Sequence, residues 1–157
     1  MLGPNNGKLA TGSFAALAIT VALGGALCWA DAADVVIGQR FHGNYSGVRR
    51  ASEQVIEDPE TWKTVWGQVH GISRPQPELP EIDFDKQSVV AVFLGNRNTG
   101  GYSIRIRAIK DNGQQVEVQV ERLSPPPGGI TTQALTQPYE MVVIGKPGKP
   151  VRFVAAE

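Results

Sequence analysis

The chain contains few residues that could carry out a chemical reaction. It has one cysteine, Cys28, and two histidines, His42 and His70. A zinc site needs three or four Cys, His or carboxylate ligands, and the sequence contains no such cluster. It also lacks a Gly-x-Ser-x-Gly nucleophile motif and a phosphate-binding glycine loop before a helix. We therefore predict a protein that is not an enzyme and that uses no metal or other cofactor.

The residues best suited to binding form a turn between two predicted strands. Residues 95–102 read Gly-Asn-Arg-Asn-Thr-Gly-Gly-Tyr. Glycine and asparagine allow positive φ angles and leave backbone amides open to a partner. We expect Arg97 to present an exposed guanidinium at the loop tip, where it would anchor an interface, with Thr99 and Tyr139 next in importance. The alternative is structural: the glycines make a tight connection, Tyr102 joins the core and Pro138 caps an edge strand.

Two further segments accompany this turn in the predicted partner-binding surface. One is a proline and glycine loop at 125–129, and the other is a short stretch at 136–139 that opens a later strand. Loops carried by a rigid β scaffold are a common place for binding residues. The predicted binding residues are Asn96, Arg97, Asn98, Thr99, Gly100, Gly101, Tyr102, Gly128, Gly129, Pro138 and Tyr139.

Only one segment predicts a helix, at residues 59–69. Asp58 is a good N-cap, Pro59 suits the first helical position, and Trp62, Val65, Trp66 and Val69 follow at helical spacing. This explains the carboxylates of Glu57 and Asp58 as helix-start residues. The prolines at 75, 77 and 80 predict an extended connector over 73–81. Phe84 is then expected in the core, between two solvent-facing aspartates at 83 and 85.

The remaining pattern predicts about six or seven short strands. Strands are expected at 88–94, 102–109, 114–122, 139–144 and 151–154, with weaker candidates at 35–37 and 51–56 around a loop at 41–47. The fold class is therefore mainly β, an antiparallel sandwich-like sheet with one amphipathic helix. A small α+β sheet with that helix on one face is the alternative.

The hairpin at residues 102–122 predicts a definite register. A three-residue loop, 111–113, ends in glycine and matches a hairpin with a left-handed glycine bulge. It would pair Lys110 with Gln114, and further along Ile106 with Val118, Ile104 with Val120, Arg107 with Glu117, and Ser103 with Glu121. That register places apolar residues on one face and opposite charges on the other.

The N-terminal segment predicts export. An uncharged, largely apolar run from 9 to 30 is followed by Ala30-Asp31-Ala32, which is typical of a signal peptide cleaved after Ala32. The run is also long enough to serve as an uncleaved membrane anchor. Lipid attachment at Cys28 is a poorer match. In both main interpretations residues 33–157 form a single domain outside the cytoplasm, periplasmic or secreted, and only residues 9–30 could contact a membrane.

The charge balance bears on the class of partner. Fifteen Lys and Arg residues match fifteen Asp and Glu residues, and the signs are interspersed. Nucleic-acid binding requires a basic face, so we expect no nucleic acid as a partner.

Several of these motifs together resemble the C-terminal domain of the PrcB-type protease-complex subunit. The resemblance rests on Gly43-Asn44-Tyr45-Ser46-Gly47, the Asp58…Trp62…Trp66 helix, Asp83-Phe84, residues 95–102, the loop at 125–129 and Pro138-Tyr139. The most specific element is Gly-x-Arg-x-Thr-Gly-Gly-Tyr. The resemblance implies an exported β-rich accessory protein, which in some members stabilises a secreted protease.

A fainter similarity is to chagasin-type cysteine-protease inhibitors, which insert three loops of a β-sandwich into a protease cleft. Residues 98–102, 127–129 and 137–139 come in the same order as those loops, but the first lacks a proline, and Gln137 and Tyr139 replace arginine and tryptophan. Three functions thus remain open: an accessory protein that docks on and stabilises a partner, a loop-inserting protease inhibitor, and a membrane-anchored structural subunit.

Overall fold

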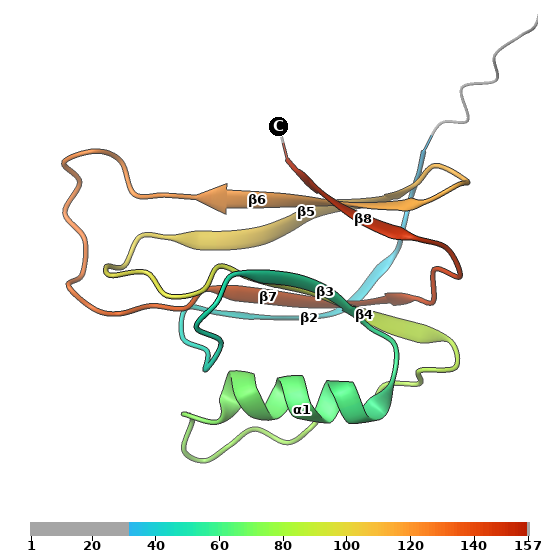
Figure 1. Ribbon diagram of the computed structural model, residues 1–157, viewed down its shortest axis with the longest axis horizontal. Helices are drawn as coiled ribbons and strands as arrows, with labels where there is room; N and C mark the ends of the chain where they lie inside the picture. Colours follow the sequence, from blue (N-terminus) through green and yellow to red (C-terminus); the bar gives the residue numbers. More distant parts are fainter. Residues whose placement is uncertain (1–31, 157) are drawn as a thin grey trace, which may run out of the picture.

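Two four-stranded sheets face each other, and in the described part of the chain one helix packs on the far side of one sheet, which is therefore the middle layer (Figure 1). The computed structural model describes residues 32–156. The outer sheet has the order β1 (Ala33–Asp34), β5 (Ser103–Asp111), β6 (Val116–Leu123) and β8 (Val151–Ala155). The middle sheet has the order β2 (Ile37–Gly43), β7 (Tyr139–Gly145), β4 (Gln87–Phe93) and β3 (Ser52–Ile56).

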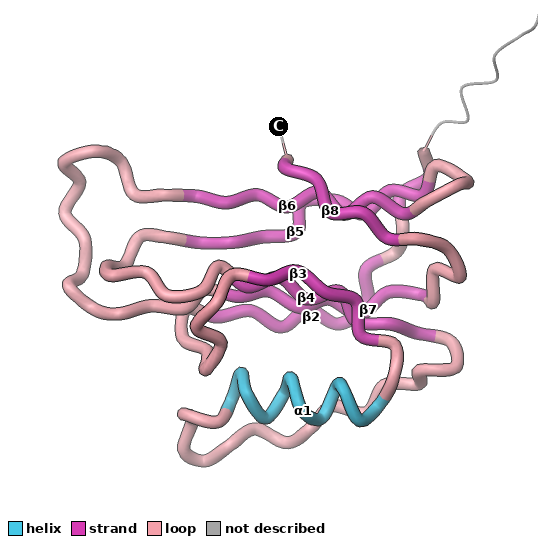
Figure 2. The backbone as a smooth tube through the Cα atoms, viewed as in Figure 1, coloured by secondary structure: helices cyan, strands magenta, loops and turns pink. Residues whose placement is uncertain are grey.

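This arrangement confirms a mainly β, sandwich-like fold with one helix. All strand pairs are antiparallel except β6 and β8, which run parallel. The described residues contain eight strands rather than six or seven, because the two-residue strand β1 adds to the edge of β5. Figure 2 shows the three layers: the outer sheet, the middle sheet and the helix.

The two central strands of the middle sheet are buried on both faces, which explains why β4 and β7 are largely apolar. In β4, Val89, Ala91 and Phe93 face the helix layer. The alternate residues Val90 and Val92 face the outer sheet. Strand β7 alternates in the same way, so these two central strands belong to both hydrophobic cores.

The helix α1 (Pro59–His70) forms as the sequence predicts. The Asp58 carboxylate accepts a hydrogen bond from Thr61 N at 2.8 Å, and the predicted apolar stripe is buried. The connector after the helix is held by both tryptophans, since Trp62 Nε1 donates to Pro80 O at 3.0 Å and Trp66 Nε1 to Pro77 O at 3.2 Å. Phe84 packs against the helix-side core, and the aspartates beside it are exposed, as expected.

The predicted register of the hairpin is wrong by two to three residues. The structure pairs Ile106 with Val120 and Ile109 with Val118, and the two strands change register between Ile106 and Ala108. This bulge brings Ile109 into the core, where a regular strand would place Ala108. The predicted pairs, including Arg107 with Glu117 and Ser103 with Glu121, therefore do not form.

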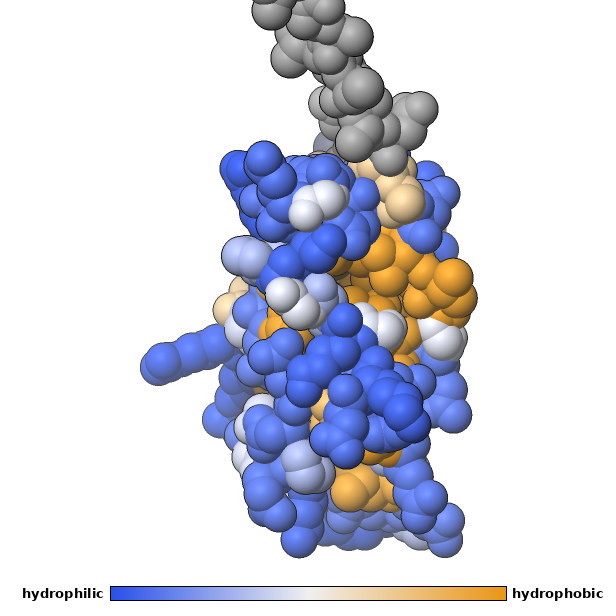
Figure 3. All heavy atoms as spheres, turned by 90° about the vertical axis from the view of Figure 1, so that its right-hand side faces the viewer, coloured by the Kyte–Doolittle hydropathy of each residue, from blue (hydrophilic) through white to orange (hydrophobic). Residues whose placement is uncertain are grey.

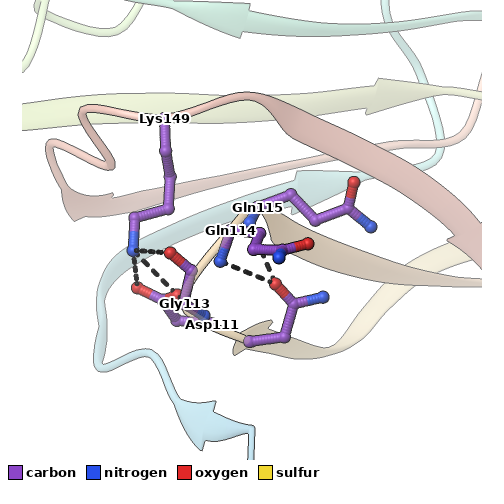
Figure 4. A network of polar contacts seen from close by, with 6 residues as sticks. Asp111, Gly113, Gln114, Gln115 and Lys149 are labelled. Carbon is purple, nitrogen blue, oxygen red and sulfur yellow. Dashed lines mark hydrogen bonds and ion pairs between the residues drawn. The ribbon is translucent and has the colours of Figure 1, made fainter.

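The turn of this hairpin is also longer than predicted. Asp111 remains in β5, and the side chain of Asn112 accepts hydrogen bonds from Gln114 N and Gln115 N at 3.1 and 2.9 Å. Lys149, from the β7–β8 connection, places Nζ 2.9 Å from both carboxylate oxygens of Asp111 (Figure 4). This ion pair and the hydrogen bond from Gly113 N hold the pKa of Asp111 below its usual value. The turn therefore has four residues, 112–115, and it is held by the side chains of Asp111 and Asn112. The position of the glycine had predicted a turn of three residues.

The first part of the described chain differs from the prediction as well. Strand β2 runs from Ile37 through Gly43, so the first three residues of the expected loop at 41–47 are strand residues paired with β7. As a sheet edge with one exposed face, β2 has too little apolar content to predict from sequence. The signal, anchor and lipidation hypotheses concern residues that lie mainly outside the described part. No helix among residues 32–156 is long and apolar enough to cross a membrane.

Candidate functional site

Three loops meet at one end of the sandwich, at the left of Figure 1, and we call this region the loop end. It comprises the β2–β3 loop (44–51), the β4–β5 loop (94–102) and the β6–β7 loop (124–138). Arg97 and Thr136 exchange two backbone hydrogen bonds of 2.8 and 2.9 Å, and Gly100 N donates to Thr132 O at 2.8 Å. The loops predicted to bind a partner therefore lie together and are joined by their backbones.

The β2–β3 loop joins the same assembly. Asn96 N donates to Arg49 O at 3.0 Å, and Gln137 N donates to Asn44 O at 2.8 Å. Gly95 makes this contact possible, because it has φ +71° and a Cβ there would lie 2.6 Å from Ala51 N. The glycine at this position therefore allows two backbones to touch, in addition to making the turn.

Arg97 does not occupy the exposed tip that the sequence suggested. It is half-buried, and its guanidinium carbon lies 5.5 Å from the centre of the Tyr102 ring. Such a cation–π contact holds the arginine side chain against the loop. A role for Arg97 in partner binding stays a prediction, and its observed contacts are with its own loop and with Thr136 of the β6–β7 loop.

The remaining predicted residues divide into exposed and buried groups. Asn96, Asn98, Gly101, Gly128 and Gly129 are exposed. Thr99, Gly100 and Tyr102 are half-buried, and the carbonyl of Thr99 accepts a hydrogen bond from Thr136 Oγ1 at 3.0 Å.

Pro138 and Tyr139 are buried, so they can position the loops but offer little side-chain surface to a partner. The Tyr139 side chain is 6% exposed, its ring stacks on that of Phe93, and burial raises the pKa of its hydroxyl. Pro138 accepts a hydrogen bond from Leu94 N, which ties β7 to the start of the β4–β5 loop. Pro138 thus opens a central strand rather than the edge strand considered from the sequence.

Apolar side chains at the loop end are further candidate binding residues, and they were not predicted from the sequence. Of the seven large apolar residues exposed among residues 32–156, four lie in or beside these loops. Ile130 is fully exposed and Tyr45 is 57% exposed, and the others are Leu123 and Leu135. The signal in the sequence was Ile130 itself, an isolated isoleucine directly after Pro-Pro-Pro-Gly-Gly, where a loop has no core to bury it.

The same loops carry positive charge and no negative charge. Residues 44–51, 94–102 and 124–138 contain Arg49, Arg50 and Arg97 but no aspartate or glutamate. Arg49 and Arg50 are exposed. The opposite end of the sandwich, which faces the viewer in Figure 3, is mostly hydrophilic, with apolar side chains gathered mainly at the upper right of that view. The loop end thus combines exposed tyrosine, isoleucine and arginine side chains and has no carboxylates. Such a composition is typical of protein interfaces.

The His and carboxylate side chains of the described residues are dispersed. Residues 32–156 contain no group of three or more His, Cys, Asp or Glu side chains that could hold a metal ion. His42 is exposed on β2, whereas the His70 ring lies 4.1 Å from that of Trp66 and burial lowers its pKa.

A β-sandwich with joined loops at one end is an architecture in which loops often carry binding residues. Residues 88–145 match the family model described as PrcB C-terminal. The match runs from β4 to β7 and contains the β4–β5 and β6–β7 loops of the loop end. This segment of the chain is therefore similar to the PrcB C-terminal family.

No curated protein and no solved structure matches the chain. The similarity to chagasin-type inhibitors consequently finds no support beyond the order of the three loops.

Proposed function

We propose that this chain is an exported, non-catalytic accessory protein whose loop end docks on a protein partner and stabilises it. The observation that carries the proposal is the composition of the loop end: exposed Tyr45, Ile130 and Leu135 beside Arg49 and Arg50, with no carboxylate in the three loops. The match to the PrcB C-terminal model supports a protease as the partner. The apolar N-terminal run and Ala30-Asp31-Ala32 support export.

The loop end favours a partner with an acidic surface that contains an apolar pocket. Three prolines and two glycines precede Ile130, so the loop is stiff on one side and adaptable at its turn. An aliphatic side chain presented in this way can enter a pocket, and the two exposed arginines can pair with carboxylates at its rim. The backbone hydrogen bonds among the loops hold this surface in place before binding.

A pull-down with a C-terminally tagged full-length chain tests the proposal. We expect a partner that co-purifies with the unaltered chain and whose recovery falls about tenfold or more in Ile130→Asp and in the double variant Arg49→Glu/Arg50→Glu. Lys63→Glu is the matched control, because Lys63 is exposed on α1, away from the loops. Equal recovery with all four proteins would contradict docking through the loop end.

Two further readouts separate the possible roles. The intact mass of the recovered chain shows whether residues 1–32 are removed, and an uncleaved chain in a membrane assembly would instead support the anchored subunit. Where the partner is a protease, its activity on a fluorescent peptide distinguishes the two other hypotheses. A stabiliser leaves the protease active and extends its lifetime, whereas an inhibitor abolishes the activity.

A further inference from the structure

Strand β5 has one edge that is only partly covered. Strand β6 pairs with it along one side. On the other side β1 pairs only with Asp111 and Lys110, and Val35 N adds one hydrogen bond to Ile109 O. The chain then turns away into β2 of the other sheet. Within the described residues, no strand lies beside residues 103–108 of β5 on this side.

The peptide groups on this edge point toward a missing neighbour. Ile106 N donates to Glu140 Oε2 and Ile106 O accepts from Arg40 Nη1 at 3.3 Å, so both groups of Ile106 face away from β6. In an antiparallel pair, alternate residues direct their N–H and C=O to the same side. The register is regular from Ser103 to Ile106, so the N–H and C=O of Ile104 face the open edge as well.

Arg40 and Glu140 take the place of a strand at one position. Their side chains are joined by an ion pair of 2.7 Å, and they supply one acceptor and one donor to Ile106 as a neighbouring backbone would. Glu140 is 4% exposed and fixed, whereas the Arg40 side chain is 38% exposed and its bond to Ile106 O is long. An incoming strand can therefore replace Arg40 at Ile106 O while Glu140 stays.

A cleft of about 310 Å³ lies beside the open edge. It is lined by Arg40 and His42 of β2, by Ile104 and Arg105 of β5, and by Tyr139 of β7. Inward-facing side chains of an added strand would enter this cleft. Its outward-facing side chains would lie next to Arg105 and Arg107, which are exposed on the outer face of β5. Arg107 also lies 3.6 Å from a carboxylate oxygen of Glu121 on β6 and stays 59% exposed.

We infer that the open edge of β5, from Ser103 to Arg107, binds an extended segment of a partner protein by strand addition. The segment carries acidic side chains at alternate positions, because two of the three outward-facing residues between Ser103 and Arg107 are arginines. A second copy of this chain fits poorly, since pairing two β5 edges antiparallel would bring arginines next to arginines. The cleft borders the loop end, since Asn44 and Pro138 also line it. Strand addition uses the backbone of β5, so it does not depend on the function proposed for those loops.

The test uses the full-length chain and a labelled seven-residue peptide of alternating valine and glutamate. We expect saturable binding by fluorescence anisotropy and slower hydrogen exchange of the Ile104 amide in the complex. A valine–lysine peptide should bind about tenfold more weakly. A valine–glutamate peptide N-methylated at alternate residues should not bind, because it cannot form the ladder with β5.

Charge reversal on β5 provides the decisive variant. In Arg105→Glu/Arg107→Glu the preference should invert toward the lysine peptide, whereas Lys63→Glu on the helix should change nothing. Arg105→Gln/Arg107→Gln, which avoids adding carboxylates near Glu121, should lose the preference and keep the fold. Binding that ignores N-methylation or charge reversal overturns the inference, as does absence of binding by either peptide or pairing of the chain with itself.

Discussion

Glu140 joins the two sheets through a single buried carboxylate. It lies on β7 of the middle sheet, yet it accepts a hydrogen bond from Ile106 N on β5 of the outer sheet and pairs with Arg40 on β2. Replacing it with alanine would leave the Ile106 amide without an acceptor in a buried position. We expect Glu140→Ala to lower the free energy of unfolding by about 2–3 kcal/mol.

The matched control is Glu140→Gln, which keeps a carbonyl oxygen for Ile106 N but removes the charge. Urea denaturation should show a clearly smaller loss for glutamine than for alanine. Equal losses in the two variants would mean that the ion pair with Arg40, rather than the hydrogen bond to β5, is what matters. The sequence could not reveal this residue, because Arg40 and Ile106 are 100 and 34 positions away from it.

The buried ring of His70 should make the free energy of unfolding depend on pH in mild acid. Its ring packs between those of Trp66 and Tyr139, Nε2 has no hydrogen-bond partner among the described residues, and burial lowers its pKa below 6.5. Between the lowered folded pKa and about 6.5, the unfolded chain binds the proton more readily than the folded chain. Stability should therefore fall as pH drops below about 6.5 and level off once both states are protonated.

Urea denaturation between pH 7.5 and pH 5 checks this expectation. The aspartates with lowered pKa values, Asp58, Asp83 and Asp111, lose their contributions only at more acidic pH, so they do not interfere in this range. His70→Phe should flatten the pH dependence, whereas His42→Gln, at an exposed position, should preserve it. An unchanged slope in His70→Phe would assign the effect to another group.

Two glycines with positive φ angles allow the cost of backbone strain to be measured separately from the cost of a steric clash. Gly95 has φ +71° and Gly113 has φ +87°, but a Cβ at Gly95 would strike the backbone of the β2–β3 loop while a Cβ at Gly113 meets nothing within 4 Å. Gly113→Ala should cost about 1–2 kcal/mol from backbone strain alone. Gly95→Ala should cost clearly more, because the loop contact through Arg49 must also open.

Denaturation curves of the two alanine variants measure this difference. Exchange rates of the Asn96 amide, which bonds to Arg49 O, report whether the loops have separated in Gly95→Ala. If both variants lose the same stability and the Asn96 amide stays protected, the β2–β3 loop is not anchored through Gly95.

Elements determined by residues close together in the sequence could be predicted, whereas those that depend on distant residues could not. The helix at 59–70 could be predicted because its cap and its apolar stripe are adjacent in sequence. The hairpin register could not, because it depends on the bulge at Arg107 and on Asp111 being held by Lys149, 38 residues away. The loop end falls between these cases: its location was predicted, but the burial of Arg97, Pro138 and Tyr139 arises from contacts among three separate loops.

At the scale of the whole molecule, the middle sheet links two cores that contain no residue in common. Val65, Trp66 and Met141 belong to the core under the helix, and Val118 and Val142 belong to the core between the sheets. Met141 and Val142 are neighbours on β7 and point to opposite faces. If the molecule unfolds as one cooperative unit, weakening either core must weaken both layers equally.

Met141→Ala tests this directly, with an expected loss of about 2–4 kcal/mol. With Trp29 replaced by phenylalanine in every variant, tryptophan fluorescence reports on Trp62 and Trp66 in the helix layer. Far-ultraviolet circular dichroism reports mainly on the sheets. Both signals should shift to the same lower denaturant midpoint in Met141→Ala, and likewise in Val142→Ala, since β4 and β7 cannot lose one face and keep the other. A fluorescence transition that moves alone in Met141→Ala would show that the helix layer unfolds separately from the sandwich.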